Sequence, residues 1–368
     1  MKKIIEEAFA SADVRINGDR RWDIVVHNED FYRRVFSELS IGLGESYMDG
    51  WWDCERIDEA FERLYRANLQ TRKYTWAKRY HYLQSKLYNM QRKSRAFQVG
   101  ERHYDTGNDL YRIMLGKRMV YCSGYYSRGA SSLDQAEEDK LELICQKLGL
   151  EAGDRVLDIG CGWGSFAKFA VENYRVEVVG ITVSKQQIAL AIELCAGLPI
   201  EFRLQDYRDI EGRYDHIVSI GMIGHLGYRN YRTLMEVTHR ALKDDGLFLI
   251  HTMGANRSTT AADPWIDRYI FANGMAPSVQ QLGAAIEELF VMEDWHNFST
   301  DYYRTALSWV ANLEEHWDEI KSRYDERFYR MWKYYLLMFS AAFSARTLQT
   351  WDIVLSKQGG RGKYHAVR

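Results

Sequence analysis

The second half of the chain alternates short apolar runs with helical patterns, and this alternation limits the possible folds more than any other feature. Helical patterns separate the first five runs, as they do where each strand of a parallel sheet is followed by a covering helix. A longer aromatic-rich helical region, residues 305–346, precedes the last run. The runs that predict strands are residues 155–158, 176–181, 200–204, 215–220, 247–252, 290–297 and 350–356. We therefore predict an α/β fold with a doubly wound, mostly parallel sheet of seven strands.

Length and composition restrict the chain further. Its 368 residues allow two or three folding units, and 46% hydrophobic residues with only three prolines are typical of a globular protein. The longest apolar stretch near the C-terminus, residues 334–343, is about half the ~20 residues that cross a bilayer. The N-terminal residues lack the apolar core of a signal peptide, so we expect a cytoplasmic protein.

The cysteines bear on disulfides and metals. There are five of them, and no two are spaced as a CxxC pair. This pattern argues against a disulfide framework and against a thiolate zinc site, and we expect no metal site. Most of the cysteines should be buried as small hydrophobic residues.

Charge is unevenly distributed along the chain. Residues 67–100 contain eight lysines and arginines, from Arg72 to Arg95, and no acid. Trp76 begins a stripe of apolar residues at helical spacing through the same stretch. Such a helix could dock on an anionic membrane surface, and it could equally pack an apolar face on the core with a solvated basic side. Nucleic-acid binding is not expected, because no recognition module accompanies the basic stretch.

The chain divides into two predicted units. The first, residues 1–97, is mixed and mainly helical, with a strand pair around residues 13–27 and helices around 28–38 and 57–66. The second, residues 98–368, contains the predicted sheet.

A glycine-rich turn follows the first strand of that sheet. The strand ends in Asp158, and Gly160, Gly162 and Gly164 follow before the next helix. Glycines let the backbone approach a ligand closely at the carboxyl edge of a sheet, and Asp158 could accept a hydrogen bond or meet a cation. The spacing differs from that of the dinucleotide fingerprint. In this context the turn resembles motif I of class I S-adenosylmethionine methyltransferases, which implies a Rossmann-like domain and S-adenosylmethionine as cofactor.

Two further strand ends supply candidate ligands for the nucleoside. Thr182, Val183 and Gln187 follow the second strand, and Asp206 and Tyr207 follow the third, where they would flank an adenine. Thr182, or the serine two residues later, could also simply cap the next helix, and capping is compatible with ligand contact.

Several additional motifs narrow the resemblance. They are HYD at 103–105 with GND at 107–109, MVYCSGY at 119–125, GMIGH at 221–225, HTMG at 251–254, DPWI at 263–266 with YIF at 269–271, and MEDWHNF at 292–298. Together they resemble the cyclopropane-fatty-acyl-phospholipid synthases and the related mycolic acid cyclopropane synthases. The match runs from about residue 98 to the end. The preceding residues occupy the place of a helical lipid-interacting domain and match more loosely.

The resemblance implies a reaction and a location. A one-carbon unit passes from S-adenosylmethionine to the double bond of an unsaturated phospholipid acyl chain, a carbocation forms, and proton loss closes a cyclopropane ring. Such a protein would be peripheral at the inner face of the membrane, and a homodimer is left open. Aromatic faces can stabilise the cation. The aromatic residues in matching motifs are Trp163, Trp265, Tyr269, Phe271, Trp295 and Tyr302.

In the family the base is a bicarbonate ion, and its ligands match this chain only in part. The family's histidine falls on His251 and its tyrosine on Tyr302, whereas its glutamate falls on Gly224. Its cysteine falls on Ser123, because Cys122 and Ser123 stand in the opposite order here. The resemblance also implies that the tyrosine preceding them, Tyr121, reaches the methionine carboxylate of the cofactor.

The missing glutamate leaves several outcomes open. Bicarbonate could bind with fewer partners, or His251 or a water could act as the base. The cation could instead be quenched to give a methylated or methylidene product, which would make the protein a related C-methyltransferase. A pseudoenzyme that binds S-adenosylmethionine and lipid without turnover is the remaining alternative.

Overall fold

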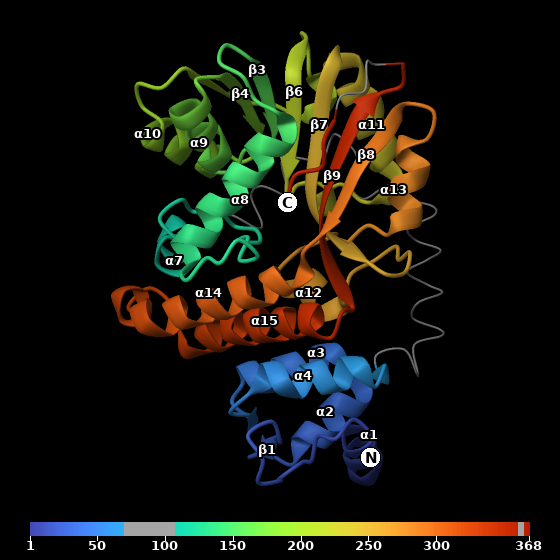
Figure 1. Ribbon diagram of the computed structural model, residues 1–368. Helices are drawn as coiled ribbons and strands as arrows, with labels where there is room; N and C mark the ends of the chain where they lie inside the picture. Colours follow the sequence, from blue (N-terminus) through green and yellow to red (C-terminus); the bar gives the residue numbers. More distant parts are fainter. Residues whose placement is uncertain (70–106, 360–363) are drawn as a thin grey trace.

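The computed structural model describes residues 1–69, 107–359 and 364–368, and a seven-stranded sheet forms its centre (Figure 1). The strand order is β5-β4-β3-β6-β7-β9-β8. The first five strands in this order are parallel, and β9 lies antiparallel between β7 and β8. The strands are β3 (Arg155–Ile159), β4 (Glu177–Thr182), β5 (Ile200–Leu204), β6 (Tyr214–Ile220), β7 (Leu242–Ala255), β8 (Phe290–Asn297) and β9 (Leu348–Lys357). The predicted α/β class and all seven predicted strands are confirmed.

Helices cover both faces of this sheet (Figure 1). They are α8 (Leu133–Leu148), α9 (Ser165–Tyr174), α10 (Lys185–Leu194), α11 (Tyr231–Ala241) and α13 (Val279–Ile286). Successive side chains of a strand point to opposite faces, and β3 shows the result. Leu157 packs in one cluster with Leu234 of α11, whereas Val156 packs in another with Phe166 of α9. Because both faces are buried, the central strands are apolar almost throughout.

A further group of helices lies beside the carboxyl ends of the parallel strands, below the sheet in Figure 1. They are α7 (Asn108–Met114), α12 (Pro264–Tyr269), α14 (Ser299–Ile320) and α15 (Glu326–Ser344). The sequence predicted one long helical region here, and the structure divides it into two helices. The second begins where the Asp325 carboxylate accepts a hydrogen bond from the Phe328 amide (2.8 Å), which is a typical N-cap.

The N-terminal unit is mainly helical, as predicted, but its strands differ from the prediction. Its elements are α1 (Lys2–Ala10), β1 (Val25–Val26), α2 (Asp30–Glu38), α3 (Ser40–Met48), β2 (Trp52–Asp53) and α4 (Ile57–Arg66). The strand pair predicted within residues 13–27 is wrong: β1 pairs with the distant β2, and only a single bridge joins Ile16 to Ile24. Two backbone hydrogen bonds surround this bridge, and beside them the buried Asp23 carboxylate accepts hydrogen bonds from the Arg15 and Arg20 amides, so side-chain bonds stand where a longer ladder would need backbone bonds.

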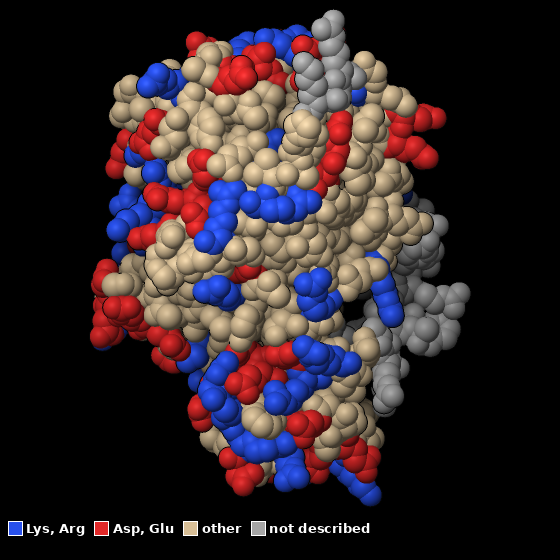
Figure 2. All heavy atoms as spheres, in the orientation of Figure 1, with Lys and Arg blue, Asp and Glu red and all other residues tan. Residues whose placement is uncertain are grey.

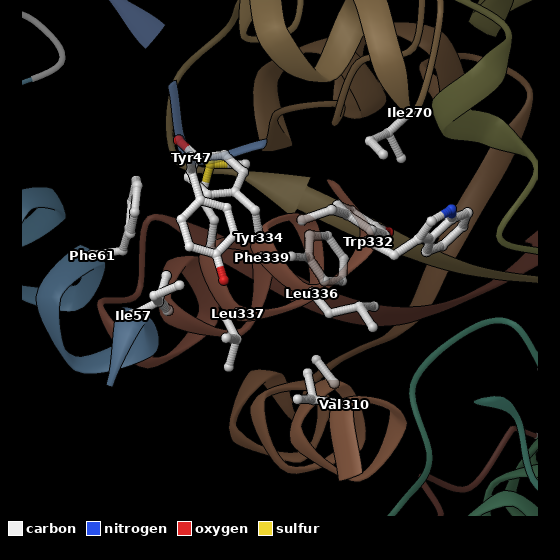
Figure 3. Packing of buried hydrophobic residues seen from close by; sticks show 14 of the residues in the cluster. Tyr47, Ile57, Phe61, Ile270, Val310, Trp332, Tyr334, Leu336, Leu337 and Phe339 are labelled. Atoms are coloured by element: carbon white, nitrogen blue, oxygen red, sulfur yellow. The ribbon is translucent and has the colours of Figure 1, made fainter. Parts of the chain in front are cut away.

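The N-terminal unit shares a hydrophobic core with α15 (Figure 3). The ring of Tyr334 lies 5.6 Å from that of Tyr47, 5.4 Å from that of Phe61 and 4.7 Å from that of Trp265. Aromatic contacts of this kind add about 0.5–1.5 kcal/mol each to the burial of apolar area. The proposed boundary at residue 97, the basic stretch from Arg72 to Arg95 and the HYD motif at 103–105 lie outside the described residues.

The C-terminus is held against the sheet by Asp294 of β8. Its carboxylate binds the buried ammonium of Lys147 (2.5 Å) and the guanidinium of Arg368 (2.6 Å). Although burial favours the neutral acid, Arg368 and Lys147 lower the pKa of Asp294 to about 2. The last residue of the chain is therefore joined to the core through an ion-pair network.

Two surface properties bear on membrane contact. On the face drawn in Figure 2, lysines and arginines alternate with acids over the N-terminal unit rather than forming one basic patch. No helix in the described parts of the chain is long and apolar enough to cross a bilayer.

Candidate active site

A cavity of about 210 Å³ lies at the carboxyl ends of the parallel strands. Its walls come from the segments that follow β3, β4, β5 and β6, from residues 119–122, from β7, and from α8, α14 and α15. This position is where open α/β sheets bind their ligands. The cavity contains most of the residues that the sequence singled out, although those residues are far apart in the chain.

The glycine-rich turn forms one side of the cavity. Gly160 and Gly162 line it with φ angles of 81° and 54°, values that residues with a side chain rarely adopt. A Cβ atom at Gly162 would meet no atom within 4 Å. The backbone there is therefore open to the cavity, and a ligand can approach it closely.

Gly164 has a different role. It is not among the described residues that line the cavity, although the motif suggested a cofactor contact. It precedes α9, and a Cβ atom there would lie 2.8 Å from the Phe202 ring and 3.1 Å from the sulfur of Cys195. Glycine is required at this position for packing between α9 and its neighbours.

Asp158 is the next-to-last residue of β3 and lines the cavity. Its side chain is fully buried, and its Oδ1 atom has no hydrogen-bond partner among the described residues. Burial raises the pKa of Asp158 to about 7. A buried acid without a partner is suited to receive a cationic group of a ligand.

The two strand ends expected to hold a nucleoside also line the cavity. Ser184, rather than Thr182, caps α10 by accepting a hydrogen bond from the Gln187 amide (3.3 Å). Thr182 donates a hydrogen bond to the side-chain oxygen of Gln187 (3.0 Å), and Val183 lies beside it in the wall. These contacts fix the rim of the cavity at the end of β4.

Asp206 and Tyr207 stand at the end of β5 and also line the cavity. The Asp206 carboxylate is buried and paired with the Arg208 guanidinium (2.9 Å). Burial raises the pKa of Tyr207 to about 12, so its hydroxyl stays neutral at physiological pH.

Aromatic rings make much of the remaining wall. Trp163, Phe271 and Tyr302 line the cavity as the sequence suggested. The other three rings named there lie elsewhere. Trp265 packs between Gly44 and Tyr334, Tyr269 stacks on Trp265, and Trp295 packs on Trp351.

The helix α15 supplies two rings that the sequence analysis missed, Tyr335 and Phe339. The Tyr121 hydroxyl donates to that of Tyr335 (3.2 Å), which places Tyr121 in the same wall. The ring of Tyr302 stacks on that of Phe343, with centroids 4.6 Å apart.

The opposite end of the cavity is polar. The Nδ1 atom of His251 lies 2.8 Å from Oδ1 of Asp352, because these residues are directly paired across β7 and β9. The Lys140 ammonium donates to the sulfur of Cys122 (3.1 Å), and Cys122 and His251 both line this end of the cavity. Lys140 and Asp352 were not identified from the sequence.

These contacts determine the charges at this end. Burial opposes ionisation of the Cys122 thiol, but Lys140 and His251 outweigh burial and lower its pKa to about 7. Burial also opposes the imidazolium, yet Cys122 and Asp352 raise the pKa of His251 to about 9. With these pKa values about half of the Cys122 side chains are thiolate at pH 7, next to an imidazolium.

Of the two positions that depart from the family pattern, Gly224 lines the cavity and Ser123 does not. Gly224, in the turn Ile223–His225 (η4), lines the cavity, and a Cβ atom there would lie 3.5 Å from the Met275 carbonyl oxygen, an ordinary contact. Ser123 is not among the described cavity-lining residues, and its hydroxyl donates to the Gly124 carbonyl (2.7 Å). Since neighbouring side chains in extended backbone point apart, Cys122 faces the cavity and Ser123 does not.

Comparisons with known proteins agree with this site. The sequence model of the mycolic acid cyclopropane synthetase family matches residues 91–353. The chain is 46% identical over 356 residues to the cyclopropane-fatty-acyl-phospholipid synthase of Escherichia coli K12, covering 96% of this chain and 93% of that protein. It is 33% identical over 274 residues to a probable fatty acid methyltransferase of Pseudomonas putida, covering 71% of this chain and 70% of that one.

Solved structures show the same likeness. A cyclopropane synthase from Mycobacterium tuberculosis superposes with a TM-score of 0.67 at 26% identity, covering 71% of this chain and 98% of that chain. A mycolic acid cyclopropane synthase complexed with SAH and CTAB gives a TM-score of 0.67 at 28% identity, over the same shares of the two chains.

Proposed function

The chain belongs to the mycolic acid cyclopropane synthetase family, and from this premise we propose that it converts unsaturated phospholipid acyl chains into cyclopropane fatty acids. S-adenosylmethionine is its cofactor and supplies the methyl group that becomes the ring carbon. The observation that carries the proposal is that one cavity joins the open glycine turn at Gly162 to the polar end at His251. A cofactor on the turn and an acyl chain against the aromatic wall would meet inside it.

The residues of the cavity fit the cofactor. The turn admits a close backbone approach at Gly162. The buried Oδ1 atom of Asp158 has no hydrogen-bond partner among the described residues, and a cationic group of the cofactor would supply one. We assign the nucleoside to the rim formed by Thr182, Val183, Gln187, Asp206 and Tyr207. Tyr121 would complete the site at the methionine end.

The cavity wall has two further tasks, which are to exclude water from the reaction and to stabilise the positive charge of the carbocation. Five aromatic residues line the cavity: Trp163, Phe271, Tyr302, Tyr335 and Phe339. A ring face near a desolvated cation contributes up to about 2 kcal/mol. Tyr302 and His251 bring polar atoms to the same space, where the proton must leave.

A second candidate product follows from Gly224. Without a carboxylate at this position the carbocation could lose a different proton and give a methylated or methylidene chain. The likeness to a probable fatty acid methyltransferase of Pseudomonas putida favours keeping this alternative. Lipid analysis distinguishes the two products.

We also propose that the protein works at the inner membrane face through the basic stretch from Arg72 to Arg95. The support is the sequence alone, in which eight cationic residues occur without an acid. Each could contribute about 1 kcal/mol at an anionic surface.

The proposed function is tested by incubating the protein with S-adenosylmethionine and vesicles of monounsaturated phospholipid. Mass spectrometry should show acyl chains heavier by one CH2 group. Gly162→Val should abolish cofactor binding by calorimetry and product formation, because the side chain would fill the cavity. Gly149→Val is the matched control. Gly149 is exposed and has a φ of 61°, and a Cβ atom there would also meet no atom within 4 Å.

Gly149→Val should lower the free energy of unfolding about as much as Gly162→Val does, but it should keep the wild-type affinity for the cofactor. Unchanged affinity in Gly162→Val would show that the cofactor does not use this turn. Wild-type protein that binds the cofactor but never alters the lipid would support the pseudoenzyme alternative.

A further inference from the structure

Four buried side chains form a continuous row at the polar end of the cavity. They come from different parts of the chain: Asp352 from β9, His251 from β7, Cys122 from the segment before α8, and Lys140 from α8. Their exposed fractions are 0%, 2%, 5% and 0% respectively. Asp352 is hydrogen-bonded to His251 and Lys140 to Cys122, and His251 and Cys122 line the same end of the cavity, where they interact electrostatically.

The order of this row is that of an activated thiol. Asp352 occupies Nδ1 of His251 and so fixes the orientation of the imidazole ring, whose positive charge favours the Cys122 thiolate. Lys140 approaches the sulfur as a second cationic group. A thiol between two cationic groups loses its proton readily, and burial keeps competing water away.

Charge balance argues against an additional anion at this end. Lys140 and protonated His251 are matched by the Cys122 thiolate and Asp352, so the row carries no surplus positive charge. A bicarbonate ion would approach a thiolate, and at Gly224 it would find no side chain with which to share its proton. The Cys122 sulfur is therefore a base supplied by the protein itself, at the place where the family pattern requires a bound bicarbonate ion.

We propose that the Cys122 thiolate is the base that removes the proton during ring closure, in place of a bound anion. The inference rests on the proposed function. A C–H bond of the transferred carbon breaks, its electron pair forms the last C–C bond of the ring, and the proton bonds to the sulfur. The carbocation is thereby neutralised and Cys122 becomes a neutral thiol. Lys140 and Asp352 are positioning residues, since they act through the sulfur and the imidazole.

Other acids near the sulfur affect how the row titrates. Asp158 lines the same cavity, and Glu137 lies one turn before Lys140 on α8. Burial raises the pKa of these two acids to about 7 and about 8. As these acids ionise with rising pH, their negative charge disfavours the thiolate, whereas the positive charges of Lys140 and His251 favour it.

The thiolate can be tested without turnover. Burial raises the pKa of the other four cysteines, that of Cys54 to about 12, so only Cys122 should ionise near pH 7. Ultraviolet titration at the thiolate absorbance should show one thiolate with a midpoint near 7. Cys122→Ser should remove it, Cys54→Ser should keep it, and Asp352→Asn should move the midpoint upward. A wild-type protein without this titration would overturn the proposal.

The role in ring closure is tested with the lipid assay in carbonate-depleted buffer. Wild-type protein and Cys54→Ser should form the ring at the same rate with and without added bicarbonate. Cys122→Ser and Cys122→Ala should lower the rate about 100- to 10,000-fold, the usual effect of losing a general base, while cofactor affinity measured by calorimetry stays unchanged. The binding measurement also shows that each variant is folded.

Two results would overturn the assignment of the base. One is ring formation at the wild-type rate in both Cys122 variants, and the other is a wild-type rate that collapses without bicarbonate and returns when it is added. Failure of the proposed function looks different, because wild-type protein would then form no ring in any buffer, whatever the state of Cys122.

Discussion

The fully buried carboxyl of Asp158 gives a sharp prediction about pH. S-adenosylmethionine carries a sulfonium and an ammonium group, and a cation in the cavity favours the ionised form of Asp158. Because burial raises the pKa of this acid to about 7 in the free protein, cofactor affinity should decline as the pH falls below 7. Asp158→Asn should bind more weakly and lose this pH dependence.

The magnitude follows from the same shift. A rise in pKa from 3.8 to about 7 corresponds to roughly 4 kcal/mol. The folded protein holds this proton more tightly than the unfolded chain does. The proton on Asp158 therefore favours the folded state fully below about pH 4, and this contribution to the free energy of unfolding is lost as the pH rises to 7. Above pH 7 the free protein carries the full cost of a buried carboxylate. Asp158→Asn should therefore unfold several degrees higher at pH 8 while binding the cofactor less tightly.

Calorimetry of both proteins between pH 6 and pH 8 measures the effect. The ligand's own amino group titrates near the top of this range and affects both proteins equally. The ratio of the two dissociation constants is therefore the relevant quantity, and it should shrink about fivefold between pH 7 and pH 6. Cys54→Ser, a change in the N-terminal unit, should keep the wild-type pH dependence. A ratio that stays constant across the range, or an Asp158→Asn protein less stable than wild type at pH 8, would refute the reasoning.

Three further predictions concern other parts of the molecule. Gly224→Glu should fold and bind the cofactor normally, and should make ring formation respond to added bicarbonate in the lipid assay; no change in rate, bicarbonate response or product ratio would place residue 224 outside the proton path. Replacing Lys78, Arg79 and Lys86 by glutamine should reduce sedimentation with anionic vesicles at 0.1 M salt and leave cofactor affinity intact, because at this salt concentration the Debye length of about 10 Å lets surface charges attract the membrane. Sedimentation that is unchanged by the substitutions and insensitive to salt would mean that the stretch is structural. Asp294→Asn should lower the melting temperature at pH 7, and the difference from wild type should vanish as the pH falls from about 4 toward 2. The reason is that the ion pairs of Asp294 stabilise the fold only while its carboxylate is ionised, and they lower its pKa to about 2. A difference in melting temperature that does not depend on pH would contradict the ion-pair account.

The sheet could be predicted because hydrophobic pattern and backbone geometry coincide there. Residues 200–204 alternate between apolar and charged side chains and residues 176–181 are mostly apolar, so the positions of these strands follow from the sequence. The N-terminal strands could not be predicted in the same way. A two-residue strand has no periodicity to detect, and the buried Asp23 replaces a ladder with side-chain bonds that no local pattern reveals.

The candidate site was predictable at its glycine turn but not at its polar end. Motif order placed Ser123 in the anion site, whereas the direction of the backbone turns Cys122 toward the cavity instead. Lys140 and Asp352 had a visible signal, since each is a charge inside an otherwise buried helix face or apolar strand. Only the pairing of β7 with β9 shows that Asp352 stands opposite His251.

The proposed cyclopropanation is tested most directly by following the transferred methyl group itself. The protein is supplied with S-adenosylmethionine carrying a trideuterated methyl group and with vesicles of monounsaturated phospholipid, and the product chains are analysed by mass spectrometry with fragmentation. We predict a saturated chain that has gained one carbon and kept two of the three deuterium atoms, which is a cyclopropane ring closed by loss of a proton from the new carbon. A chain that keeps all three deuterium atoms as a methyl branch, or that keeps a double bond, would contradict ring closure.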